Sequence, residues 1–259
     1  MTVAYSELTR VLPWSLRALR YPFGVADRAS HIVATAAAMA PEILDQISRG
    51  KDRAAGSARF GETDAGLDID AGGLSLLEVG PATMDLLGAR APQTGCLRCA
   101  IRGSTDPELI PAILLVGADY GLTCLAIVTD PQGKSWTLET NDGTPKIVRG
   151  ADLSSLEAAL ASAAPDLVAA ARAAWSAALA TDELVLLATR HAIALPPELD
   201  RVEIVDAKES VARAHRHGMP IAPETLSAIY DLEKRTWAPS SERSRAQAGF
   251  QQSSGGTAQ

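Results

Sequence analysis

Between Leu74 and Asp130, short apolar runs alternate with segments of helical period, and a Gly or Pro marks each change. Runs rich in β-branched residues predict buried strands, whereas apolar residues three and four positions apart predict amphipathic helices. The predicted order is strand, helix, strand, helix, strand, at residues 74–79, 81–91, 96–102, 107–119 and 122–129. This order is typical of a mainly parallel sheet covered by helices. We therefore expect an α/β fold that binds ligands beyond the carboxyl ends of these strands, at Gly80-Pro81, Arg102–Asp106 and Thr129-Asp130.

The same patterns predict helices on both sides of this central stretch. Further helices are expected at 5–19 (interrupted by Pro13), 25–39, 43–48, 152–180 (broken near Pro165), 207–217 and 223–235. Further strands are expected at 67–69, 184–189 and 202–205, with an antiparallel edge hairpin formed by 135–139 and 146–149. The expected architecture is a central mixed, mainly parallel sheet flanked by helices, with the N-terminal and C-terminal helices packed together.

Changes in composition divide the chain into successive segments. Residues 51–66 are polar and Gly-rich and predict an exposed connection, and the residues from Pro239 onward are dominated by Ser, Gln, Gly and charge. We expect a helical N-terminal segment at 1–50, an α/β core at 67–205, a C-terminal helix pair at 206–238 and a disordered tail at 239–259.

Composition and charge narrow the class of protein. The net charge of −7 argues against nucleic-acid binding, because no basic field is present to meet phosphates. No apolar run is long enough to span a bilayer, and Arg10, Arg17 and Arg20 interrupt the N-terminal apolar runs. Three Cys without a secretory pattern indicate a reducing compartment. A cytoplasmic protein without nucleic-acid or membrane partners is expected.

Cys96 and Cys99 form a Cys-x-x-Cys pair, which could bind a metal, act as a redox pair or pack in the core. A zinc site requires four ligands, and no second pair of matching spacing is present. A redox pair normally lies at a helix N-terminus, whereas this one opens a predicted strand, where residues three apart face opposite ways. We interpret both residues, and Cys124 on the neighbouring strand, as buried packing residues, and no metal site is expected.

The loop Arg102–Asp106 is the strongest site candidate in the sequence. It follows a buried strand and precedes a predicted helix start, so that backbone N–H groups and hydroxyls converge where a ligand would lie. The alternative is a loop in which Ser104, Thr105 and Asp106 merely cap the helix. The chain has no P-loop and no Gly-x-Gly-x-x-Gly motif, so that a Rossmann dinucleotide site is not expected.

Three separated parts of the chain share a further pattern. They are Ala26–His31 with Ile47–Gly50, Met84–Leu87 with Ala100–Thr105 and Asp119–Leu122, and Ala214–Leu226. Together they resemble the type-2 malate/L-lactate dehydrogenase family, which has a non-Rossmann fold. In addition, Arg235–Arg245 resembles the end of a shorter bacterial family known only as a domain of unknown function.

The resemblance implies roles for particular residues. His31, preceded by Ser30, matches the family's catalytic Ser-His pair and would exchange a proton with the substrate. Arg102 would bind a substrate carboxylate, and Ser104, Thr105 and Asp106 would contact NAD or NADP. The resemblance also implies a homodimer, which small residues in two predicted helices, including 25–39, would permit. Taken singly, His31 and each of the other three His are better explained as structural residues than as catalytic ones.

The sequence departs from the family pattern at several positions. Ile32 replaces the Gly after the family His, Thr35 replaces an Arg, and Asp106 replaces a second His. The Gly-rich segment expected between Asp130 and Leu184 is largely missing. Two hypotheses follow. The first is a reduced NAD(P)-dependent oxidoreductase acting on a small 2-hydroxy acid, 2-oxo acid or cyclic imine carboxylate. The second, favoured by the departures, is a non-catalytic small-molecule-binding or partner subunit descended from that family.

Overall fold

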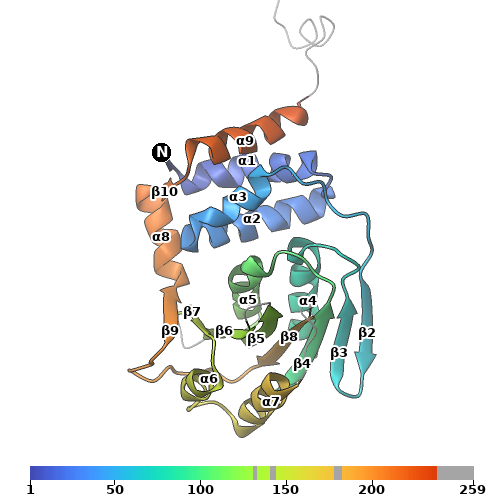
Figure 1. The fold of residues 1–259 in the computed structure, drawn as a ribbon, viewed down its shortest axis with the longest axis vertical. Helices are drawn as coiled ribbons and strands as arrows, with labels where there is room; N and C mark the ends of the chain where they lie inside the picture. The colour runs from blue at the N-terminus through green and yellow to red at the C-terminus, as the bar shows by residue number, and fades with distance from the viewer. Residues whose placement is uncertain (131–132, 141–143, 178–182, 238–259) are drawn as a thin grey trace, which may run out of the picture.

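The computed structural model describes residues 1–130, 133–140, 144–177 and 183–237 (Figure 1). Within these residues the main sheet has eight strands in the order β2-β3-β4-β8-β5-β6-β7-β9. The strands are β2 (Arg59–Thr63), β3 (Gly66–Asp70), β4 (Leu97–Arg102), β5 (Thr123–Asp130), β6 (Gly133–Thr140), β7 (Lys146–Gly150), β8 (Glu183–Thr189) and β9 (Val202–Asp206). A separate two-stranded pairing joins β1 (Thr2–Val3) to β10 (Met219–Pro220).

The prediction of a mainly parallel sheet is wrong, because the sheet is mostly antiparallel. Among the described strands, β3 and β4 are the one parallel pair of neighbours. β4 and β5 do run in the same direction, as their connecting helix suggested, but β8 lies between them and is antiparallel to both. Both faces of β5 and β8 are buried, and such strands give the continuous apolar runs that are also typical of parallel sheets.

Helices cover both faces of the sheet. They are α1 (Tyr5–Ala18), α2 (Phe23–Met39), η1 (Pro41–Ile43), α3 (Leu44–Ser48), α4 (Leu76–Arg90), η2 (Pro107–Leu109), α5 (Ile110–Ala118), α6 (Leu153–Ala159), α7 (Pro165–Ser176), α8 (Ala207–His217) and α9 (Pro223–Arg235). In Figure 1, α4 and α5 lie on one face, beneath a layer formed by α1, α2, α3, α8 and α9, and α6 and α7 lie on the other face. None of the helices in the described ranges is long and apolar enough to cross a membrane.

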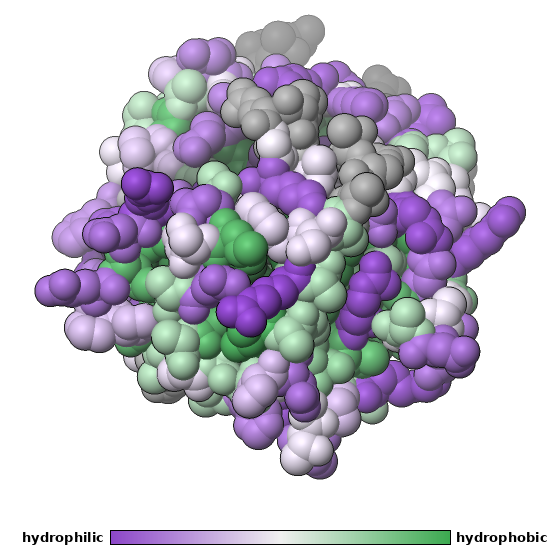
Figure 2. All heavy atoms as spheres, turned by 60° about the horizontal axis from the view of Figure 1, so that its bottom comes forward, coloured by the Kyte–Doolittle hydropathy of each residue, from purple (hydrophilic) through white to green (hydrophobic). Residues whose placement is uncertain are grey.

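The two faces of the sheet enclose separate hydrophobic cores. Alternate residues of β5 divide between them, with Cys124 and Ala126 in the core under α4 and α5, and Leu125 and Ile127 in the core under α6 and α7. Figure 2 shows apolar side chains interspersed with hydrophilic ones on the face turned forward from the bottom of Figure 1, where α6 and α7 lie. The core under α4 and α5 continues into the layer of terminal helices.

The N-terminal and C-terminal helices pack together, as predicted. The Ser15 hydroxyl donates to the backbone carbonyl of Ile229 at 2.9 Å, and the N-terminal ammonium of Met1 donates to the carbonyl of Ile221 at 2.8 Å. Arg10 of α1 forms an ion pair with Glu233 of α9 at 3.1 Å. These contacts join the two ends of the chain over the α/β core (Figure 1).

Three local predictions are wrong. The predicted strand 74–79 is the start of α4, so that Gly80 and Pro81 lie inside a helix and not in a loop. Ser75 is its N-cap, and the Ser-x-x-Glu spacing of Ser75 and Glu78 is the capping-box pattern. The expected connection 51–66 contains the exposed edge strand β2. The β6–β7 hairpin forms, but it is not at the edge of the sheet, because β9 pairs with β7 and is the edge strand on that side. The predicted tail 239–259 lies outside the described residues.

Candidate functional site

The loops that follow β3 and β4 lie side by side at one edge of the sheet. The amide of Ala71 donates to the carbonyl of Arg102, and that of Gly73 donates to the carbonyl of Gly103, both at 2.8 Å. Ser75 and Thr105 extend this pairing as an isolated parallel bridge. The loop that the sequence singled out is therefore held in place by the start of α4.

The helix-capping alternative for this loop is not what the structure shows. Asp106 is the residue before η2 and has a left-handed backbone, with φ 65°, but its side chain forms no cap hydrogen bond. Its carboxylate instead accepts a hydrogen bond from the Thr105 hydroxyl at 2.9 Å. The polar side chains of the loop are thus not used to satisfy the helix N-terminus.

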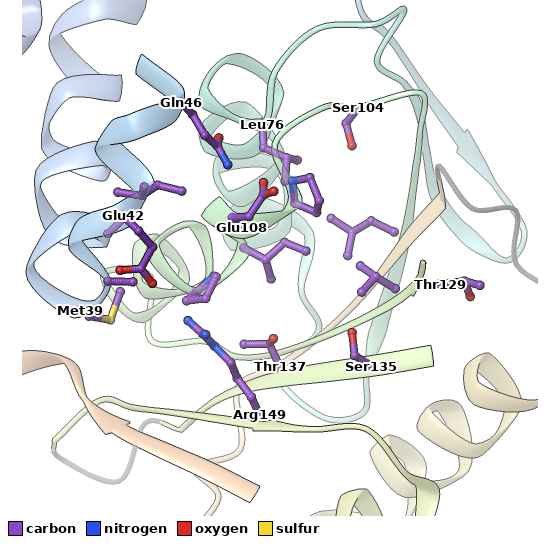
Figure 3. A pocket seen from close by; sticks show the side chains of 18 of the residues that line it. Met39, Glu42, Gln46, Leu76, Ser104, Glu108, Thr129, Ser135, Thr137 and Arg149 are labelled. Atoms are coloured by element: carbon purple, nitrogen blue, oxygen red, sulfur yellow. The ribbon is translucent and has the colours of Figure 1, made fainter. Parts of the chain in front are cut away.

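A cavity with a volume of about 560 Å³ lies next to this loop (Figure 3). Residues from seven parts of the fold line it: Ala36, Met39 and Ala40; Glu42, Ile43 and Gln46; Leu76; Ser104, Pro107, Glu108, Ile110 and Pro111; Val128, Thr129, Ser135 and Thr137; Arg149; and Glu183 and Leu184. The cavity therefore lies where the carboxyl ends of β4 and β5 meet the start of α5. That is the position expected for a ligand from the predicted strand directions.

The walls of this cavity differ in chemistry. Figure 3 shows Glu42, Gln46 and Glu108 on the helical wall, and Ser135, Thr137 and Arg149 across from them on the sheet. Arg149 is the one cation in the described lining, against the three carboxylates Glu42, Glu108 and Glu183. A small molecule in this cavity would meet charges of both signs and several hydroxyl groups.

A second cavity, with a volume of about 340 Å³, lies on the other side of the loop. Thr105 and Asp106 line it, together with Ser75 and the basic residues Arg49, Lys51 and Arg53. Its wall also includes Tyr21, whose pKa is raised by burial despite a hydrogen bond with Ser75. The two cavities share the four lining residues Ile43, Gln46, Pro107 and Glu108.

Arg102 lines neither cavity. It is the last residue of β4 and forms an ion pair with Asp68 of β3 at 2.6 Å, and this hydrogen bond raises the pKa of the guanidinium. To bind a substrate carboxylate, as expected from the sequence, Arg102 would have to release Asp68. Arg149, which the sequence reading missed, occupies the cavity wall instead.

The predicted catalytic pair is not brought into either cavity. Ser30 is buried in α2, and its hydroxyl donates to the carbonyl of Asp27 one turn earlier at 2.7 Å. His31 is exposed on the same helix, whose later residues Ala36 and Met39 form part of the first cavity wall. Of the six expected site residues, the structure places Ser104, Thr105 and Asp106 at cavities and leaves Arg102, Ser30 and His31 outside them.

A signal for the missed residues was present in the sequence. Ser135 and Thr137 alternate with Trp136 and Leu138, so that one face of β6 is polar and lines the cavity while the other is buried under α6 and α7. Arg149 faces the same cavity from β7, where it pairs in register with Thr137. This alternation distinguishes β6 from a simple edge strand and is visible in the sequence alone.

The cysteines lie against different cores. Cys99 is fully buried in the core under α4 and α5, and Cys96 packs against the core under α6 and α7. Burial raises the pKa of Cys96 to about 11 and that of Cys99 to about 12. The predicted opposite orientation of the pair is confirmed. Among the described residues, no group of three or more His, Cys, Asp or Glu is placed to hold a metal ion.

Comparisons with known proteins identify solved structures that share this architecture. No protein-family model and no curated protein matches the sequence. The solved structure of malate dehydrogenase from Entamoeba histolytica is similar, with a TM-score of 0.61 and 9% identity over 92% of this chain and 99% of the other. Sulfolactate dehydrogenase from Methanocaldococcus jannaschii has a TM-score of 0.61 and 11% identity over 91% and 97%. Δ1-piperideine-2-carboxylate reductase from Pseudomonas syringae pvar. tomato has a TM-score of 0.58 and 17% identity over 90% and 99%. The chain therefore has the fold of these dehydrogenases and reductases, at low sequence identity.

Proposed function

We propose that this protein is an NAD(P)-dependent oxidoreductase acting on a small 2-hydroxy acid, 2-oxo acid or cyclic imine carboxylate. The observation that carries the proposal is the cavity beside Ser104, at the start of α5, in a fold shared with malate and sulfolactate dehydrogenases and a cyclic imine reductase. Its volume is in the range of small-molecule sites, about 300–1,000 Å³. The nicotinamide would supply or accept the hydride, and the protein would position the substrate and move the proton.

The cofactor-contact role proposed for Ser104, Thr105 and Asp106 is supported by their division between two cavities. Ser104 faces the first cavity, while Thr105 and Asp106 face the second. A dinucleotide lying across this loop would place one end among the hydroxyls of the first cavity. The phosphates would then lie near Arg49, Lys51 and Arg53 of the second, where positive charge favours them.

Ser30 and His31 are proposed as the proton-transferring pair, as the family resemblance implies. Because His31 is exposed on α2, this role requires further residues to complete a site on the exposed face of α2. We propose that a second copy of the chain covers this face in a homodimer. The exposed Phe23, Asp27 and His31 recur at four-residue intervals and therefore share one face of α2. The small residues expected to permit a dimer do not serve here, because the alanines of α2, such as Ala29 and Ala37, are buried within the subunit.

A second candidate function is a non-catalytic ligand-binding or partner subunit. The observation that favours it is the position of Ser30, whose hydroxyl is occupied within its own helix, together with the absence of His31 from both cavity walls. Either function is consistent with a cytoplasmic location, where the three free thiols Cys96, Cys99 and Cys124 would stay reduced.

Titration of the purified full chain with NADH and NADPH, followed by nucleotide fluorescence, tests the proposal. Saturable binding of either nucleotide is expected. No binding of either would overturn the oxidoreductase and leave the non-catalytic function. If turnover of a 2-oxo acid is found, His31→Ala should abolish it, whereas His217→Ala, at an exposed position on α8, should not. Unchanged turnover in His31→Ala would remove this residue from the mechanism while leaving the oxidoreductase in place.

A further inference from the structure

The first cavity offers a ligand one cation and several carboxylates on opposing walls. Arg149 reaches in from the sheet, and Glu42 and Glu108 face it from η1 and η2 (Figure 3). A ligand that carries two negative charges would meet this surplus of carboxylates unfavourably, since like charges in a partly desolvated site repel. A ligand with charges of both signs would not.

The guanidinium of Arg149 has donors left for a carboxylate. Its Nη1 lies 3.5 Å from the Glu203 carboxylate on β9. Its Nε is buried and has no hydrogen-bond partner among the described residues. A buried donor without an acceptor is costly. The side chain as a whole is 35% exposed, so that a small rotation of the guanidinium toward the cavity would let a ligand oxygen satisfy this donor. The edge formed by Nε and Nη2 matches the bidentate geometry of a carboxylate.

The acids across the cavity are available for a cation. Within the described ranges, the carboxylates of Glu42 and Glu108 form no hydrogen bond or ion pair, and both residues line the cavity and are exposed. Glu183, by contrast, is near Arg98 at 4.0 Å and belongs to the β8 wall. The free carboxylates therefore lie on the helical side, opposite the free edge of Arg149.

We propose that the first cavity binds a small zwitterion, a cyclic amino or imino acid, with its carboxylate on Arg149 and its cationic nitrogen toward Glu42 and Glu108. The inference rests on the proposed function in taking this cavity as the substrate site, and it selects among the substrates named there. Dicarboxylates and sulfonated acids, which carry two negative charges, are disfavoured. Arg149, Glu42 and Glu108 are the specificity-determining residues.

Calorimetric titration of the full chain with L-pipecolate and with L-malate, with and without NADPH, tests the inference. Pipecolate should bind more tightly than malate. Arg149→Met and the double variant Glu42→Gln/Glu108→Gln should each weaken pipecolate binding by about tenfold or more, the size of a lost charged hydrogen bond. The double variant should bind malate better than the wild-type chain does.

Matched variants outside the cavity are Arg213→Met on α8 and Glu224→Gln on α9, both exposed, and they should leave binding unchanged. Arg149→Lys, which keeps the charge and removes the planar fork, provides a second variant if Arg149→Met does not fold. Tighter binding of malate, no binding of pipecolate under either condition, or equal loss in the matched variants would each overturn the inference. Pipecolate binding without any binding of NADH or NADPH would support it and overturn only the oxidoreductase.

Discussion

Ser75 and Thr105 form a parallel bridge between two different strand-to-helix loops. Thr105 N–H donates to the Leu74 carbonyl, and Leu76 N–H donates to the Thr105 carbonyl, both at 3.1 Å. The bridge attaches the start of α4 to the loop between the two cavities. Because Ser75 is also the N-cap of α4, the geometry of the candidate site depends on the stability of this helix start.

Ser75→Ala is therefore expected to destabilise the fold by about 1–2 kcal/mol, the usual effect of removing an N-cap side chain that is also buried. The buried Ser75 hydroxyl accepts a hydrogen bond from Leu77 N–H at 3.1 Å. Urea unfolding followed by circular dichroism measures the change. Ser227→Ala, exposed on α9, should alter the free energy of unfolding by less than about 0.5 kcal/mol. Equal midpoints for the two variants would contradict this account.

The start of α4 also shows what the sequence could and could not predict. Most helices and strands followed from local periodicity, because amphipathic helices and buried strands have distinct spacing. The residues 74–79 form a short apolar run that suits either structure, and the capping pattern of Ser75 and Glu78 was the local signal that was overlooked. Element type is a local property, and it was largely predictable.

Strand order is not a local property. β8 is inserted between β4 and β5 although it comes after both along the chain, so that two strands correctly expected to run in the same direction are not neighbours. The loop at Ser104 was predictable because it follows a strand directly. Arg149 was not, because its place in the cavity depends on β7 pairing with β6, and on β6 pairing with β5.

Gly150 is expected to be intolerant of a side chain. A Cβ at this position would lie 2.6 Å from the indole of Trp136, which is 1% exposed and donates from Nε1 to the Asp152 carbonyl at 3.1 Å. Gly150→Ala would force the indole from its site and should cost about 1–3 kcal/mol in unfolding free energy. Since Gly150 follows Arg149 in β7, the change should also weaken ligand binding in the first cavity.

Gly24→Ala is the matched substitution. A Cβ there meets nothing within 4 Å, and the residue lies in the first turn of α2, so that Ala should stabilise the chain by up to about 1 kcal/mol. Urea unfolding of both variants measures the two effects. Wild-type stability of Gly150→Ala would show that Trp136 is not fixed as described.

The three thiols are expected to react slowly in the folded protein. Burial raises the pKa of Cys96 to about 11 and that of Cys99 to about 12, and burial also raises the pKa of Cys124. The reactive thiolate is therefore scarce at neutral pH. Alkylation with iodoacetamide, counted by mass spectrometry, should modify Cys96 before the other two, and all three should react rapidly in guanidinium. Fast labelling of Cys99 in the native state would contradict the burial of the pair and reopen a redox role.

Asp85 of α4 accepts three hydrogen bonds from two side chains. Arg28 donates to both of its oxygens, at 2.6 Å and 2.7 Å, and the Tyr120 hydroxyl donates to one of them at 2.5 Å. The guanidinium of Arg28 lowers the pKa of Asp85, and the hydrogen bond to Asp85 raises the pKa of Tyr120. The cluster joins α2 to α4 and to the end of α5, one turn from His31.

Asp85→Asn should therefore lower the pKa of Tyr120, measured as tyrosinate absorbance during a titration with base. Asp85 should stabilise the fold at pH values above the pKa of an unfolded Asp, which is about 4. This stabilisation should be lost as the pH falls through the lowered pKa of Asp85 in the folded chain. Because the side chains are partly exposed, its size should not exceed about 1 kcal/mol. Asp64→Asn, in the exposed turn between β2 and β3, should change neither the tyrosine titration nor the acid stability. An unchanged Tyr120 titration in Asp85→Asn would show that the cluster does not persist in solution. One of the contacts that fix α2, and hence His31, relative to the sheet would then be absent as well.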